Sequence, residues 1–196
     1  MSKAYRIYVE KKEGFRVESD NLLDELRKHL EISGLEDLRI LVRYDIENID
    51  EDILEEAKGT IFSEPPADYL YEETFEKNED DLVFSVEYLP GQFDQREDAA
   101  LQCLKLLKGD EDPTIHAATT YILSGDLSKE DFKKIIDYCV NPVDSRIAKE
   151  DKPDSIEYKS EAPEDVEILD GFIQMGNDGM NKLYESLGLA MTMADF

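Results

Sequence analysis

The stretch from Val9 to Tyr44, VEKKEGFRVESDNLLDELRKHLEISGLEDLRILVRY, occurs a second time in this chain in altered form. Its counterpart runs from Val86 to Tyr121, VEYLPGQFDQREDAALQCLKLLKGDEDPTIHAATTY, and each residue lies 77 positions after its partner, as Val86 does after Val9. Identical residues are few, but the apolar positions follow the same period in both stretches without a gap. We interpret this as an internal duplication.

Both copies have the same order of elements. Strands rich in β-branched and aromatic residues are expected at 5–9, 38–42 and 69–71 in copy one and at 82–86, 115–119 and 145–148 in copy two. A helix follows each of the first two strands, and prolines end the second helix of each copy. The fold class is therefore α+β, a tandem duplication of a ferredoxin-like β-α-β-α-β unit with a mostly antiparallel sheet.

A single unit of this size has a thin core and open sheet edges. We therefore expect the two copies to join across a pseudo-twofold axis as a pseudo-dimer. Their first helices differ in bulk, because the inner face is expected to carry Leu22, Leu23, Leu26 and Leu30 in copy one but Ala99, Ala100, Cys103 and Leu107 in copy two. The two cysteines, Cys103 and Cys139, are expected to be buried apolar residues rather than a disulfide.

The chain divides into three parts by composition. Copy one spans 1–76 and copy two 81–148, and together they form a duplicated amino-terminal domain, 1–148. A polar connector follows at 149–167. Residues 168–196 are expected to start a helical linker domain, with one helix ending at Gly188. Thr192 and Asp195 have the spacing of a capping box without a helix body after it, which we interpret as truncation.

Composition excludes several classes of function. Asp and Glu total 48 against 22 Lys and Arg, and the formal charge of -26 would repel a phosphate backbone, so nucleic acid is not an expected partner. No apolar run approaches the roughly 20 residues of a membrane span, and the start of the sequence lacks the apolar block of a signal peptide. We expect no membrane partner and a cytoplasmic location.

Residues that could carry catalysis are scarce. His29 lies beside the apolar stripe of a helix and His116 in a strand, and neither has an evident partner in the sequence. No spacing matches a zinc site, a calcium loop or a phosphate loop. We therefore expect no catalytic residue, no metal and no cofactor in this span.

The segment Pro90–Arg96 joins a strand to a helix and exposes an aromatic, an amide and a guanidinium around a turn. Gln92, Phe93 and Arg96 are candidates for interdomain contacts, as are Asp144 and Arg146 at the boundary of the last predicted strand. The alternative, a turn and helix cap with incidental polar residues, stays open.

Four strings resemble the amino-terminal region of large phosphoribosylformylglycinamidine synthases, also called formylglycinamide ribonucleotide amidotransferases. They are EYLPGQFDQR at 87–96, IFSEPP at 61–66, NPVDSR at 141–146 and LGLAM at 187–191. The resemblance covers essentially the whole chain. It implies a ligase of purine biosynthesis that uses ATP, magnesium and ammonia derived from glutamine.

By the same resemblance, the amino-terminal domain is similar to a fused dimer of the small subunit found in the split form of the enzyme. The synthetase core and the glutaminase would lie beyond Phe196 in the same polypeptide and would be the partners of this span. No catalytic residue carries over, and neither cysteine matches the glutaminase nucleophile. The alternative function is a stand-alone acidic protein-binding adaptor on the same duplicated scaffold.

Overall fold

The computed structural model describes residues 3–107, 112–153, 155–156, 168–169, 171–188 and 190–196. The chain forms two compact units, Met1–Tyr158 and Lys159–Phe196. The first unit contains both copies of the repeat.

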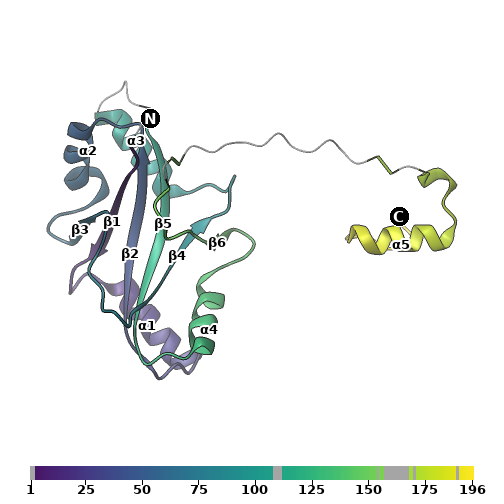
Figure 1. Ribbon diagram of the computed structural model, residues 1–196, viewed down its shortest axis with the longest axis horizontal. Helices are drawn as coiled ribbons and strands as arrows, with labels where there is room; N and C mark the ends of the chain where they lie inside the picture. The colour runs from purple at the N-terminus through teal and green to yellow at the C-terminus, as the bar shows by residue number, and fades with distance from the viewer. Residues whose placement is uncertain (1–2, 108–111, 154, 157–167, 170, 189) are drawn as a thin grey trace. The chain divides into compact units, whose positions relative to one another are not determined.

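Each copy has the β-α-β-α-β order expected from the sequence (Figure 1). Copy one consists of β1 (Tyr5–Lys11), α1 (Val17–His29), β2 (Leu35–Glu47), α2 (Glu51–Ala57), the π-helical turn η1 (Lys58–Phe62) and β3 (Asp68–Glu72). Copy two consists of β4 (Leu82–Tyr88), α3 (Gln95–Leu107), β5 (Thr114–Gly125), α4 (Lys129–Cys139) and β6 (Ser145–Ile147). The duplicated α+β fold is confirmed.

The six strands form one antiparallel sheet in the order β3-β1-β2-β5-β4-β6. The middle of this order is the pairing of β2 with β5, and Val42 lies opposite its own repeat partner, Thr119. Tyr5 pairs with Ile46 in copy one, and Leu82 pairs with Leu123, 77 positions later, in copy two. The two copies are therefore related by a pseudo-twofold axis through the Val42–Thr119 pair.

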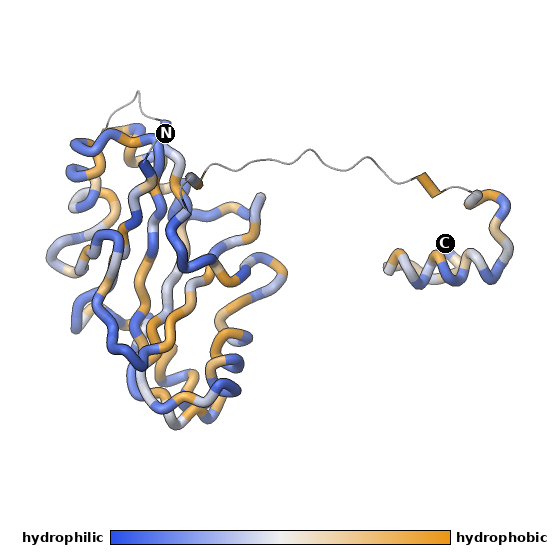
Figure 2. The backbone as a smooth tube through the Cα atoms, viewed as in Figure 1, coloured by the Kyte–Doolittle hydropathy of each residue, from blue (hydrophilic) through white to orange (hydrophobic). Residues whose placement is uncertain are grey.

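The helices cover one face of the sheet in mixed pairs. The helices α1 and α4 lie at one end of the sheet and α2 and α3 at the other, so each pair takes one helix from each copy (Figure 1). The hydropathy colours alternate along these helices, as expected for elements buried on one side (Figure 2). Two apolar cores result, one around Leu26, Leu38 and Leu123 and the other around Ile46 and Leu104.

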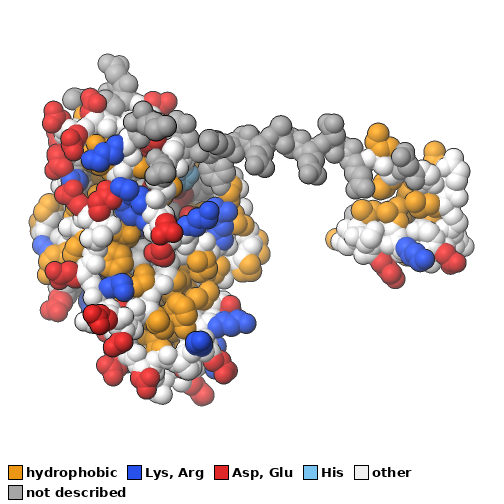
Figure 3. All heavy atoms as spheres, in the orientation of Figure 1, with side chains coloured by type: hydrophobic (Ala, Val, Ile, Leu, Met, Phe, Trp, Pro, Cys, Tyr) orange, Lys and Arg blue, Asp and Glu red, His pale blue; other side chains and the backbone are white. Residues whose placement is uncertain are grey.

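The other face of the sheet carries a small apolar cluster around Tyr8, Leu41 and Ile122 and, beside it, a group of buried charges. The side chains of Arg6, Arg43 and Asp45 are almost fully buried there, and the Arg6 guanidinium donates to both Asp45 carboxylate oxygens at 2.5 and 2.8 Å. Basic side chains lie between acidic ones on the face of this unit seen in Figure 3. Burying these charges is tolerated because they are paired.

Residues 149–153 and 155–156, which the sequence places in the connector, lie against this face of the sheet. The Arg6 guanidinium donates to the Glu150 carbonyl at 2.5 Å, and the Arg43 guanidinium to the Lys149 carbonyl at 3.0 Å. The Glu47 carboxylate accepts from the Ile156 amide at 2.9 Å. We call residues 149–153 and 155–156 the strap. The remainder of the proposed connector, 154 and 157–167, lies outside the described residues.

The expected inner face of α3 is correct at Ala100, which is buried, and at Leu107, which packs against the core. It is wrong at Ala99 and Cys103, which are exposed, and Leu104 is fully buried instead. The prediction that Cys103 is buried is therefore also wrong, whereas Cys139 is half-buried. In copy one the expected face is correct, because Leu26 is fully buried and Leu22, Leu23 and Leu30 pack around it.

The second unit is small. It contains the 3-10 turn η2 (Phe172–Gln174) and α5 (Asn177–Leu187), which ends at Gly188 in the left-handed conformation, as expected. The ring of Phe196 contacts those of Phe172 and Tyr184, with centroids 6.1 and 5.6 Å apart. Among the residues that the structure describes, no helix has the length and apolar character needed to span a membrane.

Candidate binding cavity

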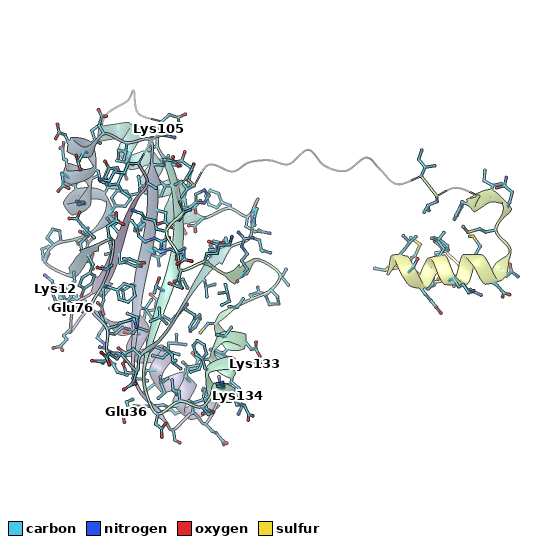
Figure 4. The ribbon with its side chains drawn as sticks, viewed as in Figure 1. Lys12, Glu36, Glu76, Lys105, Lys133 and Lys134 are labelled. Atoms are coloured by element: carbon cyan, nitrogen blue, oxygen red, sulfur yellow. The ribbon has the colours of Figure 1, made fainter. Side chains whose placement is uncertain are left out.

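Two cavities lie in the first unit and share Tyr44 and Arg96 in their linings. Lys105 of α3 and Lys133 and Lys134 of α4 lie outside both linings, at opposite ends of the unit (Figure 4). Val42 and Thr119 on the pseudo-twofold axis are only half-buried. One cavity lies in each copy.

The two cavities occupy equivalent positions but differ in size. The copy-two cavity measures about 700 Å³ and is lined by residues that include Val86, Glu87, Thr119 and Tyr121. The copy-one cavity measures about 170 Å³ and is lined by the repeat partners of those four residues, Val9, Glu10, Val42 and Tyr44. The pseudo-twofold axis therefore relates the two cavities.

The size difference follows from the first helix of each copy. Ala99 and Ala100 line the larger cavity, and their repeat partners in copy one are Leu22 and Leu23, which pack into the core around Leu26. Replacing leucine by alanine removes three carbon atoms at each position. The smaller side chains of α3 leave space that leucine fills in copy one.

Arg96 of α3 lies between the two copies and lines both cavities. Burial raises the pKa of Tyr44 in copy one and of Tyr121 in copy two, which are repeat partners. The positive charge of the Arg96 guanidinium lowers the pKa of both phenols and so opposes part of that rise. Both hydroxyls therefore stay protonated at neutral pH.

The carboxylates near the larger cavity are engaged by other groups. Glu87 accepts from the Arg146 guanidinium at 2.8 Å. Asp94 caps α3 by accepting from the amides of Arg96 and Glu97 at 2.7 and 3.2 Å. Asp144 accepts from the Asn141 side-chain amide at 3.0 Å. By contrast, no described carboxylate forms an ion pair with Arg96.

The five candidate contact residues come together at one end of copy two. The Leu89 amide donates to the Asp144 carbonyl at 2.8 Å and so joins the loop before α3 to the loop before β6. Gln92 and Phe93 are exposed on the first loop, with 71% of Phe93 accessible. The cavity lining includes Arg96 and Asp144, and Arg146 lies beside it on β6 through its bond to Glu87.

Sequence reasoning did not assign Tyr44, Tyr121, Ala99 and Ala100 to a site. A signal for the tyrosines was present, because they occupy the same position of the two repeats. The alanines were assigned to packing against the sheet, although Ala99 faces the cavity instead.

His116 has partners that the sequence could not show. Its Nε2 lies 3.1 Å from the Ile156 carbonyl oxygen in the strap, and its Nδ1 lies 3.6 Å from the Glu97 carboxylate. Burial raises the pKa of Glu97, which also accepts from the Ala117 amide at 2.7 Å. These bonds tie α3 and the strap to β5. Among the described residues, no group of three or more side chains could hold a metal ion.

No protein-family model matches this chain, and a search of curated proteins finds no match. Its function is therefore inferred from its residues, its geometry and the resemblance described above.

The two cysteines line the larger cavity but are expected to differ in reactivity. Burial raises the pKa of the Cys139 thiol to about 12, whereas Cys103 is exposed. Because the thiolate is the reactive form, Cys103 should react with a disulfide reagent at neutral pH at least about 100-fold faster than Cys139. Labelling rates of Cys103→Ser and Cys139→Ser would measure this, with equal rates expected in urea. Equal rates in the folded variants would contradict it.

Proposed function

We propose that this chain is the amino-terminal, non-catalytic part of a phosphoribosylformylglycinamidine synthase. Such a ligase makes formylglycinamidine ribonucleotide from formylglycinamide ribonucleotide, ATP and glutamine in cytoplasmic purine biosynthesis. The observation that carries the proposal is the pseudo-dimer, in which β2 and β5 join two repeats in one sheet. This architecture agrees with the fused small-subunit dimer that the resemblance implies.

In this proposal the span supports chemistry that occurs elsewhere in the same polypeptide. ATP and magnesium would bind to the synthetase core, and glutamine would be hydrolysed by the glutaminase. The duplicated domain would pack against these partners and help to organise the passage of ammonia. The loop carrying Gln92 and Phe93 is the candidate contact, because an exposed phenylalanine at a loop tip is a common anchor of protein interfaces.

The adaptor alternative differs in what accompanies this span. Under the synthase proposal, the reading frame that encodes this chain also encodes an ATP-binding core, and the full polypeptide restores growth without purines to a synthase-deficient strain. An adaptor would have no such core and would not restore growth. Sequencing the frame and testing complementation separate the two functions.

Phe93→Ala in the full polypeptide is expected to lower glutamine-dependent synthesis about tenfold, the effect of losing one well-packed interface contact. Activity with added ammonium should change much less, because externally supplied ammonia does not depend on the coupling of the domains. Steady-state rates with glutamine and with ammonium measure the difference.

Phe15→Ala is the matched control, since Phe15 is also an exposed phenylalanine, 56% accessible, in the loop before α1 of copy one. It should leave both activities near the wild-type rates. Unchanged coupling in Phe93→Ala, or an equal fall of both of its activities, would overturn the assignment of this loop.

A further inference from the structure

We propose that the copy-two cavity is a binding site for a small molecule that carries a carboxylate or phosphate group on an apolar body. The cavity is defined by its position between α3, β5 and the loop before β6, and its volume is about 700 Å³. This proposal is independent of the proposed function.

The anion-binding group is Arg96. Its guanidinium has fixed, planar donors suited to a carboxylate or phosphate, and it forms no ion pair with a described carboxylate. The hydroxyls of Tyr44 and Tyr121 remain protonated and so are available as donors. Tyr44 from copy one and Arg96 and Tyr121 from copy two thus all line the cavity.

The neighbouring acids hold partners other than the Arg96 guanidinium, although Asp94 and Asp144 keep their negative charge because their donors are neutral. Glu87 is neutralised by Arg146, and Asp94 is engaged by the first amides of α3. Asp144 is half-buried and accepts from Asn141. Arg96 is therefore the cation available to a ligand, even though the protein as a whole is strongly acidic.

The rest of the wall suits an apolar body. Ala99, Ala100 and Val86 contribute apolar surface, and the volume falls within the range of about 300–1,000 Å³ that is usual for ligand pockets. The equivalent cavity of copy one, at about 170 Å³, is too small. The site is therefore expected once per chain.

Three differences between the copies lie at this cavity. The repeat partner of Arg96 is Ser19, which is buried and donates to the carbonyl of Arg16, the residue before α1. The partners of Ala99 and Ala100 are Leu22 and Leu23. Copy two has thus gained a cation and lost bulk around the same space. A purely structural role explains neither change, because filling this space with leucine would bury more apolar surface.

The test is an NMR titration of the whole chain with four probes of similar size. Phenyl phosphate and benzoate carry the two anionic groups, benzamide is neutral, and benzylamine is cationic. The titrations are run in about 0.15 M salt, at which the repulsion from distant acidic residues is screened beyond about 8 Å. Arg96→Met removes the cation, and Ala99→Leu restores the residue of copy one.

Lys105→Met is the matched control, since it removes a cation from the same helix but outside the cavity lining. We expect at least one anionic probe to shift amide signals of α3 and β5, and Arg96→Met and Ala99→Leu each to weaken its binding tenfold or more. Lys105→Met should bind as the wild type does. The preference between phenyl phosphate and benzoate identifies the anionic group.

Three results would overturn the proposal. The first is that neither anion shifts the signals of α3 and β5 at millimolar concentration. The second is that benzamide or benzylamine binds as tightly as the anions, which would indicate a merely apolar or an acidic pocket. The third is that a correctly folded Arg96→Met variant, checked by its amide spectrum, binds the anion with wild-type affinity.

Discussion

Replacing Asp45 by alanine is expected to lower the free energy of unfolding by about 3–5 kcal/mol. The carboxylate lies between two buried guanidinium groups, with Arg6 Nε at 2.5 Å and Arg43 Nε at 3.4 Å. Between 3% and 6% of each of these side chains is accessible. Burial lowers the pKa of Arg6, but its bond to Asp45 and the carboxylate charge outweigh this effect and raise it overall. Without Asp45, the buried Arg6 would have no counter-ion among the described residues, and Arg43 would keep only Glu87, at 3.9 Å.

Urea unfolding of the wild type and the variant measures this loss. Asp24→Ala is the control, because Asp24 forms an ion pair with Lys28 at a similar distance, 2.8 Å, but both side chains are more than half exposed. Exposed pairs contribute at most about 1 kcal/mol. Equal losses in the two variants would show that the Arg6–Asp45 pair contributes no more than a surface pair.

The same ion pairs explain why the strap could not be predicted. Its composition is polar, as in an extended connector, and its bonds to the sheet run largely through its own backbone. Arg6 and Arg43 donate to carbonyls at 150 and 149, groups that every residue carries. The residues that hold the strap in place are the arginines on β1 and β2, which lie more than a hundred positions earlier in the sequence.

The sheet, by contrast, could be predicted because the repeat constrains it. The constant offset of 77 residues shows which elements of the two copies are equivalent, and the spacing of their apolar residues shows whether each is a helix or a strand. Pairing of the copies through β2 and β5 then gives the backbone of these two central strands its hydrogen-bond partners. Both strands extend beyond the expected 38–42 and 115–119 at both ends. The sequence alone did not reveal which strands meet at the axis.

The orientation of α3 could not be predicted for a different reason. Ala99 and Cys103 form one apolar pair at helical spacing, and Ala100 and Leu104 form another, rotated by one residue. Periodicity does not choose between them. The choice depends on packing against the sheet, where Leu104 is fully buried. The cavity beside Ala99 is a consequence of that choice, so it could not be predicted either.

Gly125→Ala is expected to destabilise the first unit by about 3 kcal/mol or more. Gly125 ends β5 with a φ of +133°, a conformation that costs other residues about 1–3 kcal/mol. A Cβ atom there would also lie 2.1 Å from the Gly34 carbonyl oxygen and 2.8 Å from the Glu36 nitrogen. Both obstacles are backbone atoms, so the backbone of β2 would have to move near Leu35, where its register with β5 is irregular. This movement is expected to add about 1–3 kcal/mol to the loss of stability.

Gly14→Ala separates the two contributions to this loss. Gly14 also has a positive φ, +88°, but a Cβ atom there would have no neighbour within 4 Å. Its substitution should therefore cost only the conformational part, about 1–2 kcal/mol. Urea midpoints of the two variants measure the difference, which corresponds to the close approach of the chain at Gly34 and Gly125. If both variants lost the same stability, the sheet would accommodate a methyl group at this point, and the close approach would not constrain the pairing of the two repeats.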